Sequence, residues 1–194
     1  MHWETGRLSE VTVLFADCRG YTRLTHELGI EKVAPITEEF FTTSAQIIRE
    51  HHGIVDQLLG DAIMALFNVP IKHDDHVLRA VGAAFRIQEA VNHINAKLDG
   101  RVVLGVGIGI ATGTALATNM GSTNCNDYTM VGDSINIASR LQGKAATGEI
   151  LVTDEAYKPI SAAFPGAIRA EYLLKGISQP VAAHRLYRGP SAMT

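Results

Sequence analysis

Apolar residues recur along the chain in two spacings, and the change from one to the other predicts the order of strands and helices. Short apolar runs rich in β-branched residues predict strands at 11–16, 54–59, 62–67 and 102–111. Apolar residues at helical spacing predict one long helix over 30–52 and another from Asp74 or Asp75 to about Lys97. This order of strand, helix, strand, strand, helix, strand is the ferredoxin-like βαββαβ pattern.

The second half of the chain adds shorter elements to this core. Its pattern predicts further strands at 115–120, 128–131, 150–152, 167–174 and 181–187. Helices are expected from Asp133 or Ser134 to Leu141 and, more briefly, from Asp154, with a polar loop over 122–127. No repeat or linker divides the 194 residues. We therefore predict a single α+β domain over residues 1–194, with a ferredoxin-like core and additional C-terminal strands and helices.

Two aspartates stand at positions where this topology brings chain segments together. Asp17 directly follows the first strand, and Asp61 lies in the Gly60-Asp61 turn between the two hairpin strands. The first strand neighbours the hairpin in this fold, so both carboxylates are expected at one edge of the sheet. Adjacent carboxylates repel unless hard cations bind between them, and such a site suits displacement at phosphorus. By position alone, the roles of helix cap and ordinary turn residue remain the commoner ones for aspartate.

Three residues in the second half could bind phosphate or sugar groups. Asn136 and Arg140 are four apart on a predicted helix and share one face. Arginine binds phosphate bidentately, and the asparagine amide can donate to a sugar or phosphate oxygen. Lys175 precedes Gly176 in a predicted turn, where its ammonium could meet a triphosphate. For each of the three, an ordinary solvated surface position is the alternative.

Composition excludes several classes of protein and site. The formal net charge of −3 shows no basic excess, so nucleic-acid binding is not expected. No apolar run approaches the ~20 residues of a membrane span, and the N-terminus does not resemble a signal peptide. Cys18 and Cys125 belong to no CxxC pair, which argues against zinc and favours a reducing compartment. We expect a cytoplasmic domain, alone or within a larger protein.

Clusters of glycine and histidine suggest a nucleotide-binding loop and a metal site, but their spacing supports neither. Gly105, Gly107 and Gly109 alternate without completing a Gly-x-Gly-x-x-Gly motif before a helix, so we interpret them as a thin strand face against which another element packs closely. His51, His52, His73 and His76 lack both metal-site spacing and an obvious carboxylate partner. A helix end and a capped loop explain the histidines better.

Four segments, taken in order, resemble the signature motifs of class III adenylyl and guanylyl cyclases. They are residues 13–22, 53–67 and 127–141, and the turn Leu174-Lys175-Gly176 followed by Pro180. The resemblance spans about residues 8 to 188, and four motifs in register are far more specific than one. It implies the class III cyclase fold and two divalent cations, Mg²⁺ or Mn²⁺, held by Asp17, Asp61 and the backbone carbonyl of Cys18.

The resemblance also implies roles for the second-half residues. Asn136 would orient the ribose, Arg140 would stabilise charge on the phosphate under attack, and Lys175 would contact the terminal phosphates. Members of the family work as dimers with shared sites, so the expected partner is a second copy of the chain. One copy would supply the aspartates, and the other would supply Asn136, Arg140 and the residues that read the base. A sensor domain outside this chain would regulate activity.

The base-reading positions depart from the usual pattern of the family. They hold Gln57 and Thr129, where adenylyl cyclases usually carry lysine with aspartate or threonine. In a further departure, Gly107 stands near the position where some members carry a phosphate-binding arginine. Thr129 favours ATP, so we expect an adenylyl cyclase that makes 3′,5′-cyclic AMP and pyrophosphate. A guanylyl or dual-specificity cyclase and a catalytically weak nucleotide-binding regulatory module remain alternatives. A diguanylate cyclase is set aside, because the hairpin lacks the Gly-Gly-acidic-acidic-Phe turn.

Overall fold

The computed structural model describes residues 6–98, 103–119 and 128–187. Along the chain the elements are β1 (Leu8–Arg19), α1 (Tyr21–Leu28), α2 (Ile30–Glu50), β2 (Ile54–Leu59), β3 (Ala62–Phe67), α3 (His76–Ala96), β4 (Gly105–Asn119), β5 (Tyr128–Val131), α4 (Asp133–Lys144), β6 (Ile150–Thr153), α5 (Asp154–Tyr157), the 3₁₀ turn η1 (Lys158–Ile160), β7 (Ile168–Tyr172) and β8 (Val181–Leu186). None of the helices within these ranges is both long and apolar enough to cross a membrane.

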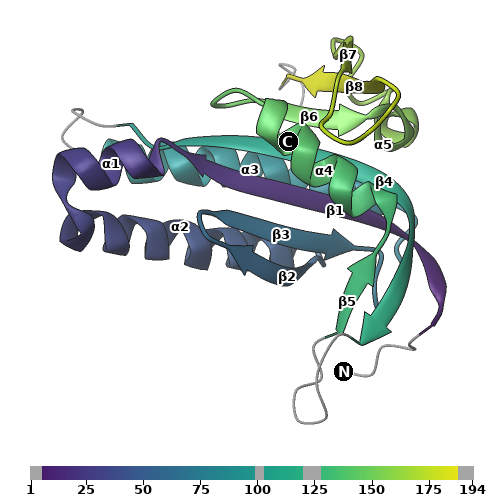
Figure 1. The fold of residues 1–194 in the computed structure, drawn as a ribbon, viewed down its shortest axis with the longest axis horizontal. Coiled ribbons are helices and arrows are strands. Elements are labelled where there is room, and N and C mark those ends of the chain that lie inside the picture. The colour runs from purple at the N-terminus through teal and green to yellow at the C-terminus, as the bar shows by residue number, and fades with distance from the viewer. Residues whose placement is uncertain (1–5, 99–102, 120–127, 188–194) are drawn as a thin grey trace.

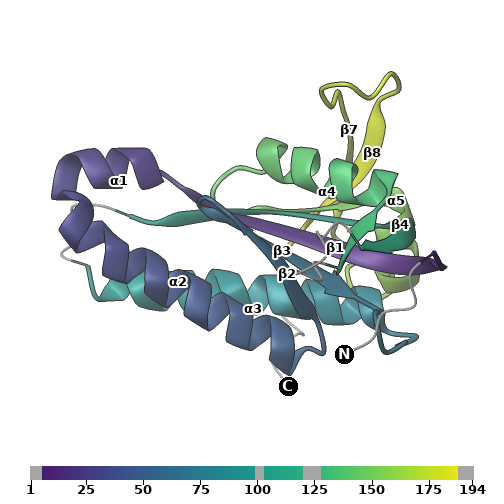
Figure 2. The same cartoon turned by 60° about the horizontal axis from the view of Figure 1, so that its bottom comes forward.

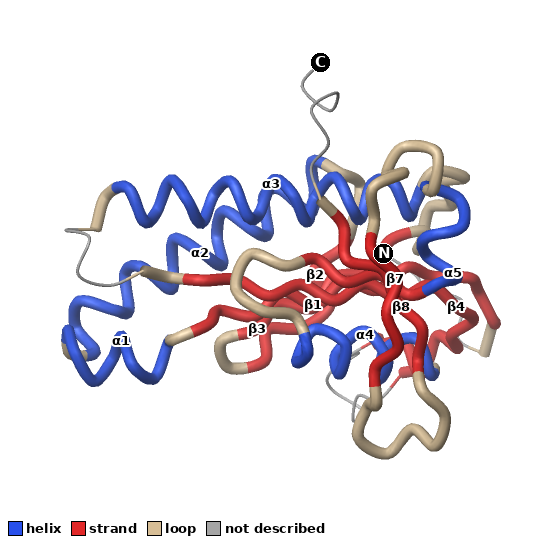
Figure 3. Tube along the Cα trace, turned by 90° about the horizontal axis from the view of Figure 1, so that it is seen from above, coloured by secondary structure: helices blue, strands red, loops and turns tan. Residues whose placement is uncertain are grey.

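A single mixed sheet runs through the molecule in the order β2-β3-β1-β4-β6-β8-β7, and β5 pairs with β4 (Figure 1). Helices α2 and α3 cover one face of the sheet and α4 covers the other (Figure 2). Seen from above, the β7–β8 hairpin projects at the far end of the sheet from α1 (Figure 3). The segment β2-β3-β1-β4 has the ferredoxin-like order, so the predicted α+β class and topology are confirmed.

Strand β1 is apolar on both faces because both are covered. Leu14 packs in the core on the α2 and α3 side with Ile48 and Ile87, all fully buried. Val13 lies on the opposite face in a second cluster that includes Ala138 of α4. A strand buried on both faces is a continuous apolar run rather than an alternating one, which explains the pattern seen in the sequence.

Two features of the fold differ from the sequence-based expectation. The segment after Gly20 forms helix α1, which was not predicted. The strands expected at 102–111 and 115–120 are one long strand, β4, which continues through Gly113. A Cβ at Gly113 would lie 3.2 Å from the Cβ of Ser134 in α4. Gly113 therefore allows a helix to approach and does not mark a turn.

Helix capping was predicted only in part. Asp75 is the N-cap of α3, but its side chain makes no capping bond and accepts from Arg79 Nε at 2.6 Å instead. The N-cap of α4 is Gly132, so the prediction of Asp133 or Ser134 was wrong. Asp133 is the first helical residue, where a carboxylate still interacts favourably with the helix dipole.

His76 is buried between the sheet and the start of α3. Its Nδ1 lies 2.7 Å from Thr12 Oγ1, which is in turn 2.7 Å from Thr112 Oγ1. The Glu10 carboxylate is 3.8 Å from His76 Nε2, so the expectation of no carboxylate partner was wrong for this histidine. His76 thus connects α3 to β1 and β4 through polar contacts.

Helix α4 lies directly against the glycines of β4. A Cβ on Gly109 would overlap the backbone nitrogen of Gln142 and the carbonyl oxygen of Ala138. A Cβ on Gly107 would lie 2.9 Å from the carbonyl oxygen of Ala145, just beyond the end of α4. Both contacts are with backbone atoms, which cannot rotate away. The expectation that these glycines form a thin strand face is confirmed.

We predict that Gly109→Ala destabilises the domain by about 1–3 kcal/mol, because the added methyl group forces helix and strand apart. Chemical denaturation followed by circular dichroism measures the change in unfolding free energy. Gly143→Ala is the matched control, since Gly143 lies within α4 and a Cβ there would meet nothing within 4 Å. The control should be neutral or stabilising, by up to about 1 kcal/mol. Equal effects of the two substitutions would contradict the close packing.

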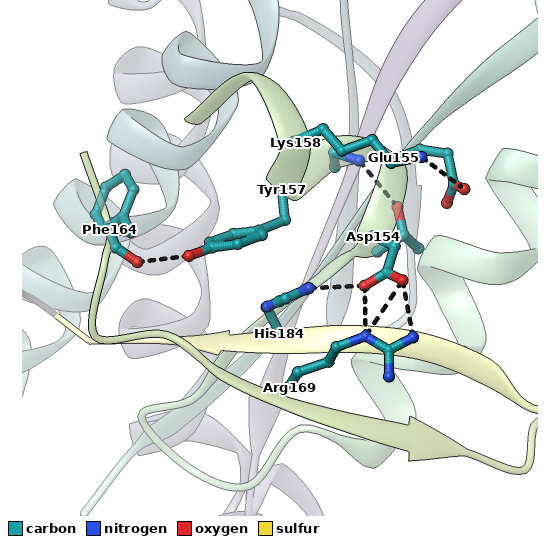
Figure 4. Close-up of polar contacts among 9 residues, drawn as sticks. Asp154, Glu155, Tyr157, Lys158, Phe164, Arg169 and His184 are labelled. Atoms are coloured by element: carbon teal, nitrogen blue, oxygen red, sulfur yellow. Dashed lines mark hydrogen bonds and ion pairs between the residues drawn. The ribbon is translucent and has the colours of Figure 1, made fainter. Parts of the chain in front are cut away.

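The Asp154 side chain, just after β6, binds both strands of the C-terminal β7–β8 hairpin. Arg169 of β7 donates to both carboxylate oxygens of Asp154, with its Nη2 at 3.0 Å from Oδ2 (Figure 4). His184 of β8 places Nε2 2.7 Å from Oδ1, and its ring stacks on Tyr157 with centroids 3.7 Å apart. Because Arg169 and His184 are cross-strand partners, one carboxylate holds both strands of the hairpin.

Hydrogen bonding from Arg169, with further contributions from His184, lowers the pKa of Asp154 below its ordinary value. A lowered pKa in the folded state adds stability at neutral pH that is lost as the pH falls through that pKa. We predict that Asp154→Asn lowers the melting temperature by a few degrees at pH 7, and that the deficit shrinks near pH ~3. Glu155→Gln, at an exposed neighbouring position, is the control. It should leave the melting temperature unchanged at both pH values. A deficit independent of pH would contradict the ionic origin.

Candidate active site

The end of β1 and the β2–β3 turn bring the two predicted aspartates together. Asp17 pairs across the sheet with Ala62, and the N–H of Cys18 donates to the carbonyl oxygen of Asp61 at 3.0 Å. Gly60, with φ of 65°, forms the tight turn that places Asp61 beside β1. The juxtaposition expected from the topology is therefore observed.

The two carboxyl groups interact strongly. Burial raises the pKa of Asp17 above its ordinary value, and the negative charge of the neighbouring Asp61 raises it further. Arg19 and Gln142 act in the opposite direction and favour the charged form. The Asp17 side chain is only 16% exposed, so this repulsion is weakly screened by water. A cation bound between the carboxylates would remove it.

The available ligands fit a divalent cation that also binds the substrate. Within the described residues, Asp17 Oδ1 is buried and has no hydrogen-bond partner. Those residues contain no group of three or more histidine, cysteine, aspartate or glutamate side chains that could hold a metal. Mg²⁺ characteristically takes one or two protein carboxylates and completes its shell with phosphate oxygens and water. This donor set therefore suits Mg²⁺ or Mn²⁺ bound together with a triphosphate.

Cys18 contributes no reactive thiol to this site. Its side chain is a free thiol, 3% exposed, in the core on the α2 and α3 side of the sheet. Burial, followed by the charges of Asp17 and Asp61, raises its pKa to about 12. The thiol therefore stays protonated, and the predicted contribution of Cys18 through its backbone carbonyl remains a prediction. Cys125 lies outside the described residues.

Two residues that the sequence analysis did not single out hold Asp17 in place. Arg19 Nη1 donates to Asp17 Oδ2 at 2.9 Å, and Gln142 Nε2 donates to the same oxygen at 2.8 Å. Arg19 also donates through Nη2 to the carbonyl oxygens of Gln142 and Ala145 at 2.5 and 3.1 Å. These carbonyls lie at the C-terminal end of α4, where the helix dipole favours a cation. The contact between Asp17 and Gln142 spans 125 residues of sequence, so no local motif signals it.

Asn136 and Arg140 lie in α4, and Arg140 is close to the turn that contains Lys175. Asn136 is exposed and Arg140 is partly buried, with its Nη1 3.2 Å from the position a Cβ on Gly176 would take. Residues 174–177 form a turn closed by Ile177 N–H donating to the Leu174 carbonyl, and Gly176 has φ of 74°. The predicted turn is thus present, Lys175 in it is exposed, and the Arg140 guanidinium lies beside its Gly176.

Helix α4 contacts Asp17 through one face and carries Asn136 and Arg140 on a different face. Residues two apart in an α-helix are separated by ~200°, so Asn136 and Arg140 point roughly opposite to Ala138 and Gln142. The Ala138 and Gln142 face packs on β4 and reaches Asp17 of the same chain. Asn136 and Arg140 therefore face away from their own carboxylates.

Gln57 owes its position to a β-bulge in β2. The pairing register shifts between Val55 and Gln57, so Gln57 pairs with Met64, while Ala62 pairs with Asp17. The bulge places exposed Gln57 on the same face of the sheet as Asp17, whereas unbroken alternation would turn it to the opposite face. Thr129 lies in β5, paired with Thr118, and its side chain is outside the described residues.

The sequence matches a known protein family over nearly its whole length. The model of the "Adenylate and Guanylate cyclase catalytic domain" family matches residues 3–187. This chain belongs to that family. The match covers every described element, including the carboxylate pair, the outer face of α4 and the β7–β8 turn.

Individual relatives agree with the family assignment. An adenylate cyclase from Anabaena cylindrica is 32% identical over 159 residues, which cover 78% of this chain and 31% of that protein. Adenylate cyclase 1 of Rhizobium meliloti is 30% identical over 136 residues, 69% of this chain and 20% of that protein. The cyclase domain thus spans less than a third of the length of these two relatives.

Solved structures of cyclases superpose closely on the domain. The guanylyl cyclase Cya2 has a TM-score of 0.87 and 28% identity, covering 94% of this chain and 93% of its own. The adenylyl cyclase CyaB from P. aeruginosa also has a TM-score of 0.87, at 25% identity, covering 97% of this chain and 98% of its own. Both substrate classes are therefore represented among the structural neighbours of this cyclase domain.

Proposed function

We propose that this cyclase domain converts ATP to 3′,5′-cyclic AMP and pyrophosphate, with two divalent cations at the interface of a homodimer. The observation that carries the proposal is the meeting of Asp17 and Asp61, with a buried carboxylate oxygen that has no hydrogen-bond donor among the described residues. Asp17 is not a helix cap, because Gly20 is the N-cap of α1, and its side chain is only 16% exposed.

The reaction joins the ribose 3′-oxygen to the α-phosphorus and breaks the bond from that phosphorus to the bridging oxygen of pyrophosphate. The proton of the 3′-hydroxyl is released to solvent. Bound Mg²⁺ or Mn²⁺ would acidify the attacking hydroxyl and neutralise charge on the leaving phosphates. Asp17 and Asp61 would hold the cations, together with the Cys18 carbonyl, and Arg19 and Gln142 keep Asp17 in place.

Asn136, Arg140 and Lys175 would act on the substrate held by the other subunit. Their face of α4 points away from the carboxylates of its own chain, so a second chain must bring carboxylates to it. Arg140 can donate two parallel hydrogen bonds to the phosphate under attack, and Lys175 in the turn near Arg140 can neutralise the terminal phosphates. Asn136 can hold the ribose in the orientation that directs its 3′-oxygen at phosphorus.

Base choice would depend on Gln57 and Thr129. Thr129 favours ATP, by its resemblance to adenylyl cyclases. The Gln57 amide can both donate and accept hydrogen bonds, so it can pair with the edge of either purine. Guanylyl activity is therefore the second candidate, supported by the likeness to the guanylyl cyclase Cya2. We further propose that in the whole protein a sensor region regulates this domain within the cytoplasm.

Incubation of the purified domain with Mn²⁺ and either ATP or GTP tests activity and base choice together. We predict cyclic AMP as the main product, detected by chromatography and mass spectrometry. Asp17→Ala and Asp61→Ala should each reduce product formation to below about 1% of wild type, because each removes a cation ligand. Wild-type turnover in either variant would refute the two-metal assignment, and nucleotide binding without any product would favour the regulatory module.

Mixing inactive variants tests the shared site. Asp61→Ala and Arg140→Ala impair different halves, so a mixed dimer retains one intact site, and random pairing should restore about a quarter of wild-type activity. The matched control mixes Asp61→Ala with Asp17→Ala, which impair the same half, so no activity should return. If mixed dimers form but the first mixture stays inactive, the site is not shared between subunits.

A further inference from the structure

We propose that Gln142 is a positioning residue that fixes the orientation of the Asp17 carboxylate for cation binding. This inference rests on the proposed function, because it concerns the same carboxylate pair. It assigns a role to a residue on α4 that lies outside the set of ligands and substrate-binding groups inferred above.

Gln142 is placed to act on one oxygen of Asp17 only. Its Nε2 donates to Asp17 Oδ2 at 2.8 Å, while Oδ1 remains buried without a hydrogen-bond donor in the described part of the chain. Fixing one oxygen of a carboxylate also fixes the plane of the group, so the direction of Oδ1 is set as well. The carboxylate is thus oriented before any cation binds, which removes part of the ordering cost of binding.

The Gln142 side chain is confined by the groups that pack around it. The residue is 7% exposed, and its backbone nitrogen lies only 2.3 Å from the position that a Cβ on Gly109 would take. Arg19 Nη2 donates to its carbonyl oxygen at 2.5 Å, so the end of α4 is held from a second direction. A buried amide confined in this way has a fixed donor direction, as expected of a group that orients a metal ligand.

Gln142 offers a cleaner test than Arg19, which donates to the same oxygen. Replacing Arg19 would remove a positive charge next to the carboxylates and change cation affinity through electrostatics alone. Gln142 is neutral, so its replacement changes the hydrogen bond and leaves the formal charge of the site unaltered. An effect on cation binding then reports the loss of this hydrogen bond and not the loss of a formal charge.

Gln142→Met keeps the length of the side chain and removes the donor, and Gln142→Asn keeps the amide but shortens its reach. We expect each variant to bind Mn²⁺ about 10-fold more weakly than wild type, the lower end of the range for residues that support metal ligands. The probe is Mn²⁺ titrated into the domain with a non-hydrolysable ATP analogue, with free Mn²⁺ followed by electron paramagnetic resonance. In turnover assays, the Mn²⁺ concentration for half-maximal rate should rise about 10-fold, with kcat at saturating Mn²⁺ changed less than about 3-fold.

Gln46 provides the matched control. It also lies in a helix and donates from Nε2 to a carboxylate, Glu50 Oε1, at 2.8 Å, but it is on α2, across the sheet from α4. Gln46→Met should leave Mn²⁺ binding and its concentration dependence unchanged. Thermal unfolding of all variants checks that they are folded, and if Gln142→Met does not fold, Gln142→Asn decides the question.

The outcomes separate this inference from the proposed function. If wild type binds no Mn²⁺ with nucleotide and makes no cyclic product, the two-metal function itself is wrong, and the role of Gln142 falls with it. If wild type binds Mn²⁺ and the folded Gln142 variants bind it equally well, only the positioning role is overturned. Weaker binding in both Gln142 variants, with the Gln46 variant unchanged, supports it.

Discussion

The contact between the backbone of α4 and the glycines of β4 positions the groups that orient Asp17 in the candidate active site. Because Gly107 and Gly109 have no side chains, the helix lies close enough for Gln142 to reach a carboxylate on the neighbouring strand. The space beside Gly107 also holds the Arg19 guanidinium, whose Nη2 lies 2.8 Å from where a Cβ would be. Asp17 is therefore oriented by the packing of α4 on β4 as well as by Arg19 of its own strand.

The same packing produces an electrostatic balance at the carboxylate pair. Burial and the proximity of Asp61 disfavour a charge on Asp17, whereas Arg19 and Gln142 favour it. Without a cation these effects oppose one another within a few ångströms. Divalent cations with a triphosphate would satisfy both carboxylates and supply the ligands that this chain lacks. The pair therefore suits ions that arrive with a substrate better than a permanently bound structural metal.

The order of the elements, and with it the meeting of Asp17 and Asp61, could be predicted because apolar periodicity reports which faces are buried. Helix α1 could not, because its eight residues carry few apolar side chains and follow Gly20, which suggests a break. The role of Gln142 was also hidden, since its partner is 125 residues away and an isolated glutamine gives no signal. The bulge that reorients Gln57 likewise depends on strand pairing, which sequence periodicity does not report.

Helix α4 contacts Asp17 of its own chain through one face and presents Asn136 and Arg140 on the opposite face. In a symmetric dimer, this single rigid element would belong to both reaction centres at once. A displacement of the helix by a fraction of an ångström would then alter how cations are held in one centre and how phosphate is stabilised in the other. In such an enzyme, a structural change at one active site would also affect the other. The two active sites would therefore be able to communicate without an additional allosteric domain.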